Sequence, residues 1–149
     1  MRITTRGRYA LRASLAMAKL RTNGQPVSIN SLAEYENISS VFLEQIFFKL
    51  RKAGIVSAMR GPGGGFYFAH DLDKLTVKQI LDAVGEKLDI TFCNKRDDDC
   101  TKVGECLSHQ ILVGANELIK EYFGNITLAS ILKKEQPFFS ADPEAKKRE

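Results

Sequence analysis

All three cysteines of the chain lie in one short stretch, and one of its two histidines follows directly behind them. The four residues are Cys93, Cys100, Cys106 and His109, in the segment FCNKRDDDCTKVGECLSHQ. Thiolate and imidazole groups are the side chains that hold soft and borderline transition metals. This segment therefore indicates a metal or redox centre.

The spacing within this set differs from that of common zinc sites. The gaps between successive members are six, five and two residues, whereas zinc fingers and ribbons use paired C-x2-C ligands. Such wide gaps suit a loop around a larger group, for example a 2Fe–2S cluster, which needs four protein ligands. Two alternatives stay open: His109 as an uninvolved surface histidine, and a metal-free thiol switch among the three cysteines.

Bulk properties restrict the class of protein. The 149 residues contain no apolar run of about 18 residues and no signal-peptide pattern, which favours a cytoplasmic protein without a membrane span. In a reducing cytosol, clustered cysteines bind metal or react more often than they form structural disulfides. Residues 1–60 carry ten Lys/Arg and three Asp/Glu, a net charge of +7, and residues 61–149 carry −3. The basic front half predicts an anionic partner.

Three short helices are predicted in this basic half. Apolar residues recur at spacings of three and four over residues 5–22, 29–36 and 41–53. The second and third helices are joined by a few residues, which is a helix-turn-helix pattern. In that geometry the second helix of the motif enters the DNA major groove. The residues predicted to reach DNA from this region are Ser39, Ser40, Glu44, Gln45 and Arg51.

A glycine-rich turn between two predicted strands follows the third helix. The strands span residues 55–59 and 66–69, and the turn consists of Arg60, Gly61, Pro62, Gly63, Gly64 and Gly65. Glycines let the backbone approach a phosphate closely, and Arg60 adds positive charge. The turn does not fit a Walker A loop or G-x-G-x-x-G. A hairpin directly after a helix-turn-helix predicts a winged helix whose tip contacts DNA, with a plain hairpin turn as the alternative.

The back half is predicted to hold a long helix over residues 107–123. Its apolar stripe suits a core position or a dimer interface and comprises Ile111, Leu112, Ala115, Leu118, Ile119 and Tyr122. The expected fold is mainly α with a small β-hairpin. The expected division is a winged helix-turn-helix DNA-binding domain (1–88), a cysteine-bearing cluster-binding loop (89–106), a dimerisation helix with a short following helix (107–134) and a disordered tail (135–149).

Three parts of the chain resemble a known family. The segments TRGRYALRA (5–13) and FLEQIFFKLRKAGIVSAMRGPGGGF (42–66), with the cysteine and histidine set, are similar to the IscR-like winged-helix transcription regulators, over about residues 1–133. That family also includes the nitric-oxide sensor NsrR and the cysteine-metabolism regulator CymR. The resemblance implies a homodimer that binds a palindromic operator in double-stranded DNA.

The resemblance also implies a 2Fe–2S cluster, received from the iron–sulfur cluster assembly machinery. Its ligands would be Cys93, Cys100 and Cys106, with His109 as the fourth. The first gap of the set is one residue longer than in typical IscR. A ligand from the partner subunit's N-terminal helix is therefore the alternative for the fourth position.

The expected function is a transcription regulator, repressing or activating, that senses cluster supply, iron, redox state or nitric oxide. Two alternatives are a regulator that works as a metal-free thiol switch and, from a different class, an iron–sulfur electron-transfer protein. An enzyme is not expected, because no nucleophile–base pair has local support in the sequence.

Overall fold

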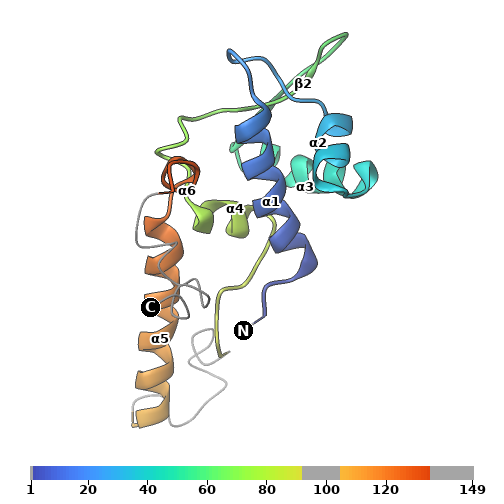
Figure 1. The fold of residues 1–149 in the computed structure, drawn as a ribbon. Coiled ribbons are helices and arrows are strands. Elements are labelled where there is room, and N and C mark those ends of the chain that lie inside the picture. Colours follow the sequence, from blue (N-terminus) through green and yellow to red (C-terminus); the bar gives the residue numbers. More distant parts are fainter. Residues whose placement is uncertain (1, 92–104, 135–149) are drawn as a thin grey trace, which may run out of the picture.

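A computed structural model describes residues 2–91 and 105–134 of the chain. Helices dominate this part, together with one antiparallel hairpin (Figure 1). The elements are α1 (Thr5–Leu20), α2 (Ile29–Glu36), α3 (Ser40–Lys52), β1 (Val56–Met59), β2 (Gly65–Phe68), α4 (Val77–Ala83), α5 (Leu107–Asn125) and α6 (Leu128–Leu132). The predicted fold class, mainly α with a small hairpin, is confirmed. The predicted disordered tail, residues 135–149, lies outside the described residues.

The helix boundaries follow local chemistry. The Ser28 hydroxyl caps α2 by accepting a hydrogen bond from the Ser31 N–H at 3.1 Å, and Asn37 follows the last residue of α2 in the left-handed conformation. Ser39 precedes α3, and its side chain makes no capping hydrogen bond. α1 ends at Leu20, two residues earlier than predicted, before a turn at Asn23.

One hydrophobic core joins the three N-terminal helices. Three small residues of α1 are at most 1 % exposed and allow the helices to approach closely: Ala10, Ala13 and Ala16. α3 contributes its largest buried residue, Phe47, whose ring centroid lies 4.9 Å from that of Phe66 on β2. This contact fixes the hairpin relative to α3.

A segment outside the hairpin also pairs with β2, which the sequence did not predict. Val27 and Phe66 exchange two backbone hydrogen bonds of 2.8 Å, so the segment before α2 pairs with β2. A Cβ atom at Gly65 would fall on the Val27 carbonyl, well inside van der Waals contact. Glycine at this position therefore permits the close approach that holds the base of the hairpin.

The starts of α4 and α6 are paired through their backbones. Thr76 and Thr127 each cap the following helix with a capping box, and the two residues form an antiparallel bridge. The Val77 N–H donates to the Ile126 carbonyl at 2.9 Å. α5 is joined to the body at this end and runs from there as a long column, with its N-terminal end far from the hairpin (Figure 1).

The start of α1 is held by a residue distant in sequence. The Glu86 carboxylate accepts hydrogen bonds from the backbone N–H and the hydroxyl of Thr4, both at 2.7 Å. A negative side chain at a helix N-terminus is favoured by the helix dipole. Within residues 2–91 and 105–134, no helix has the length and apolarity needed to cross a membrane.

Candidate DNA-binding surface and metal-ligand residues

The outer face of α3 is available to a partner. Four residues, Leu43, Ile46, Phe47 and Leu50, are buried against the core, so the 3.6-residue period turns the intervening positions to solvent. Of the residues predicted to reach DNA, Ser39, Glu44, Gln45 and Arg51 are exposed and Ser40 is half-buried. The structure therefore leaves four of these five side chains accessible to solvent.

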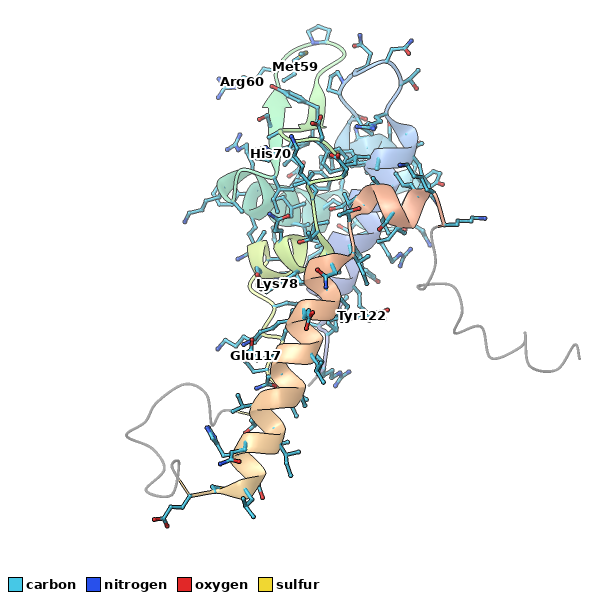
Figure 2. The ribbon with its side chains drawn as sticks, turned by 90° about the vertical axis from the view of Figure 1, so that its left-hand side faces the viewer. Met59, Arg60, His70, Lys78, Glu117 and Tyr122 are labelled. Atoms are coloured by element: carbon cyan, nitrogen blue, oxygen red, sulfur yellow. The ribbon has the colours of Figure 1, made fainter. Side chains whose placement is uncertain are left out.

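The turn of the hairpin forms a protruding tip. Arg60, Gly61, Pro62 and Gly63 are exposed, and Gly64 and Gly65 are half-buried. The tip is closed by a hydrogen bond from the Gly64 N–H to the Gly61 carbonyl at 2.9 Å. Met59 and Arg60 mark this end of the molecule in Figure 2, opposite the N-terminal end of α5. The tip is thus a projecting, uncovered loop with one cationic side chain at its base.

Positive charge gathers at the C-terminal end of α3. Lys49, Arg51 and Lys52 occupy its last turn, where cations also complement the helix dipole. The guanidinium carbon of Arg51 lies 5.9 Å from the centre of the Phe48 ring. Together with Arg60 on the hairpin, these groups provide a basic surface of the kind that binds nucleic-acid phosphates.

Two of the four predicted metal ligands lie at the start of α5. Cys106 is the residue before the helix; its thiol is free and makes no capping hydrogen bond. His109 follows three residues later, a spacing that puts both side chains on the same face of the first turn. Nδ1 of His109 is buried and has no hydrogen-bond partner among the described residues. An imidazole nitrogen without a partner is chemically suited to bind a metal.

The other two predicted ligands, Cys93 and Cys100, lie outside the described residues. Within the described part, no three His, Cys, Asp or Glu side chains gather in a way that could hold a metal ion. The donors that are placed, one thiol and one imidazole, match a 2Fe–2S cluster in chemical type. Cys106 and His109 are therefore suitable members of the predicted ligand set.

A buried amide connects the chain before the cysteine segment to the helix after it. Asn116 on α5 has no exposed surface, and its Oδ1 accepts a hydrogen bond from the Ile90 N–H at 2.6 Å. One turn further, Lys120 lies 3.5 Å from Asp89 and 3.1 Å from Glu117. The hydrogen bond with Glu117 raises the pKa of Lys120 against the opposing effect of burial, and Asp89 adds to the rise.

The predicted apolar stripe of α5 divides into two faces. Ile119 and Phe123 pack against a small core formed by Val77, Leu81, Leu88 and Ile126. The other face stays in solvent: Leu107, Ile111, Leu118 and Tyr122 are 74, 72, 68 and 52 % exposed. Figure 2 shows side chains along the free length of this helix. The helix also continues to Asn125, two residues past its predicted end.

Comparison with known proteins decides the family. Residues 3–134 match the family Rrf2, described as iron-dependent transcriptional regulators. The chain belongs to the Rrf2 family. A relative, the HTH-type transcriptional regulator IscR of Xenorhabdus nematophila, is 37 % identical over 142 residues, which are 95 % of this chain and 85 % of that protein.

Solved structures of Rrf2-type regulators have the same fold. The structure of T. potens IscR matches with a TM-score of 0.71 at 28 % identity, over 90 % of this chain and 88 % of the other. The structure of CymR, the global cysteine regulator of B. subtilis, also matches with a TM-score of 0.71 at 28 % identity, over 90 % and 98 %. This Rrf2 chain is therefore a winged-helix transcriptional regulator and not an enzyme.

Two features of this Rrf2 chain were missed from the sequence. Asn116 interrupts the apolar series Leu112, Ile119 and Phe123, and a polar residue in such a series is the signal that could have revealed it. Phe48 follows Phe47 directly, and adjacent helical residues point about 100° apart. Only one of the two rings can face the core, so Phe48 had to be exposed.

Proposed function

We propose that this chain is a homodimeric transcription regulator whose operator binding is controlled by a 2Fe–2S cluster. One observation carries the proposal: a basic α3 and hairpin surface shares a chain with Cys106 and His109, whose buried Nδ1 has no described partner. The proposed units are the DNA-binding domain (1–88), the cluster-binding loop (89–106) and the dimerisation helix with α6 (107–134). A DNA-binding role would place the protein with the chromosome in the cytoplasm.

The DNA-binding unit would act through α3 and the hairpin tip. Gln45 and Glu44 are exposed where base edges would lie, since amide and carboxylate groups can bond adenine and the cytosine amino group. Arg51 and Arg60 would bind phosphates, and the Gly61–Gly65 backbone would approach the flanking minor groove. Two such units related by a twofold axis fit a palindromic operator in double-stranded DNA.

The exposed face of α5 would form the dimer interface. Leu107, Ile111, Leu118 and Tyr122 recur every three to four residues or multiples of that spacing, as in helices that pair with a copy of themselves. A twofold contact along this face buries these side chains, which otherwise stay in water.

Cys93, Cys100, Cys106 and His109 would hold the cluster, received from the iron–sulfur cluster assembly machinery. When bound, the cluster would supply one-electron redox chemistry and sensitivity to iron supply or nitric oxide. Because Asn116 holds Ile90 on α5 and Cys106 begins α5, both ends of the ligand segment belong to this helix. Ligation would therefore constrain a closed segment between the DNA-binding unit and the dimer interface, and its loss would shift the relative positions of the two heads.

Purification without oxygen tests this proposal. We expect a coloured protein with about two iron atoms per chain, as a 2Fe–2S cluster requires, and a loss of colour in Cys106→Ser. His109→Ala should lower iron content or change the visible spectrum. His70→Ala, which alters an exposed histidine after the hairpin, is the matched control and should change neither. A colourless, iron-free protein from iron-replete cells contradicts the proposal.

A metal-free thiol switch is the second candidate, favoured by the similarity to CymR and by the free thiol of Cys106. Mass spectrometry of alkylated thiols after mild oxidation separates the two candidates. Oxidation among the three cysteines that changes DNA binding in iron-free protein supports the switch. An electron-transfer role is a poor account of the chain, because its Rrf2 relatives are transcription regulators.

A further inference from the structure

The outer face of α3 exposes two large apolar side chains. Val41 is 63 % exposed and Phe48 is 57 % exposed. Neither belongs to the buried face of the helix, which is Leu43, Ile46, Phe47 and Leu50. Adjacent exposed apolar groups rimmed by polar residues are a mark of an interaction site, whereas single ones are not.

These two side chains share a face with Gln45. The three positions are separated by four and three residues, so they form one row along the helix. Val41, Glu44, Gln45, Phe48 and Lys49 line a shallow depression on the surface. The row therefore has an amide at its centre and an apolar group at each end.

The surroundings of the row favour duplex DNA as the partner. Lys49, Arg51 and Lys52 stand beside it, and the Arg51 guanidinium lies over the Phe48 ring. The major groove offers the complementary pattern, because its walls carry phosphates and its floor carries thymine C5-methyl groups as its apolar feature. A second protein would need an acidic rim around an apolar patch to match the same surface.

We propose that Val41 and Phe48 are specificity-determining residues that contact thymine methyl groups in each operator half-site. This inference rests on the proposed DNA-binding function. Seven residues of helix span about 10.5 Å at 1.5 Å per residue, which is longer than the step of about 3.4 Å between base pairs, so the two side chains meet different base pairs. The half-site then carries two separate thymines, with a base pair read by Gln45, suited to adenine, between them.

Removal of single methyl groups from the DNA tests the proposal. Full-length protein is first used to select binding sites from a random duplex library. Each thymine of a selected site is then replaced by deoxyuridine, which lacks only the C5-methyl group. We expect two sensitive positions per half-site, each with about a fourfold loss of affinity, the effect of one buried methyl group.

Variants assign each methyl contact to one side chain. Val41→Ser should abolish the deoxyuridine effect at one position and leave the other, and Phe48→Ser should do the reverse, as in a double-mutant cycle. Tyr35→Ser on α2 is the matched control, because Tyr35 is an apolar residue of similar exposure, 52 %, outside α3. It should keep both effects. Circular dichroism confirms that each variant folds.

The outcomes separate this inference from the proposed function. If no sequence is selected, DNA binding itself fails. If sites are selected but no deoxyuridine position matters, or if both serine variants keep the wild-type pattern, DNA binding stands and the methyl contacts are overturned. A third outcome is that the serine variants keep the DNA preference but change the molecular mass of the assembly in analytical ultracentrifugation. Val41 and Phe48 would then belong to a protein–protein contact, which also overturns the inference.

Discussion

The side-chain oxygen of Asn116 accepts a hydrogen bond from the backbone N–H of Ile90 at 2.6 Å. The two residues stand on opposite sides of the cysteine-bearing segment. Their bond ties the chain that enters this segment to the helix that leaves it. Asn116 itself has no exposed surface, so its amide oxygen depends on this bond for a partner.

Asn116→Ala tests the contribution of this bond to folding. The variant leaves the Ile90 N–H without its acceptor, so the free energy of unfolding should fall by about 1–3 kcal/mol in urea denaturation. Glu121→Ala, an exposed change on the same helix, should stay within about 0.5 kcal/mol of the wild type. Equal effects of the two variants would argue against a specific role for the amide.

The ion pairs of Lys120 predict a dependence of stability on alkaline pH. Glu117 and Asp89 raise the pKa of Lys120 above its ordinary value of 10.5 in the folded state. The stabilisation is therefore fully present below pH 10.5 and is lost as the pH rises through the raised value.

We expect Lys120→Gln to be less stable than the wild type at neutral pH, with a difference that shrinks above pH 10.5. Thermal unfolding from neutral to alkaline pH measures this difference in stability. Other lysines and tyrosines titrate in both proteins, so their effect is removed by the comparison with the wild type. Lys87→Gln, at an exposed position, is the control. A constant difference at all pH values contradicts the assignment.

Two glycines of the hairpin should differ in their response to alanine. Gly65→Ala places a methyl group against the Val27 carbonyl, so the Val27–Phe66 pairing must open. Both the free energy of unfolding and the affinity for DNA should therefore fall. At Gly63 nothing lies within 4 Å of an added Cβ, and only the positive φ of 73° opposes the change. Gly63→Ala should lower the free energy of unfolding by about 1–2 kcal/mol, and urea unfolding of both variants compares them. Equal losses would disagree with the packing at Gly65.

Arg51 and Arg60 should contribute through phosphate contacts. Removal of one contact lowers affinity for all sequences similarly and reduces the slope of log K against log salt by about 0.9. Fluorescence anisotropy with a duplex at several salt concentrations measures this slope for Arg51→Ala and Arg60→Ala. Lys87→Ala, a charge change of the same sign away from α3 and the hairpin, should leave the slope unchanged.

The local elements of this fold were predictable because their signals are local. The row Leu43, Ile46, Phe47 and Leu50 and the glycine-rich turn indicated α3 and the hairpin directly. The hydroxyls of Thr76 and Thr127 cap the helices that follow them, and a threonine just before a helical pattern is a local signal. Each of these features depends on residues within about one helical turn or one hairpin.

Features made by distant residues were not predictable in the same way. The Glu86 carboxylate meets Thr4 across 82 positions, and Val27 pairs with Phe66 although no strand pattern surrounds it. The long helix illustrates the same limit, since its apolar stripe was evident while its division into a packed and an exposed face depends on α4. At the candidate site, the spacing of Cys106 and His109 could be read, whereas the burial of the His109 Nδ1 atom could not.

The bridge between Thr76 and Thr127 is the point about which a tilt of α5 would pivot. The 19 residues of α5 extend about 28 Å from this bridge to the end that carries Cys106. A tilt of about 5° at the pivot would move that tip by roughly 2.5 Å, given the same helix length. Under the proposed function, a small displacement at the predicted ligand end would change the angle of α5 at this bridge, where α4 and α6 join the body that presents α3.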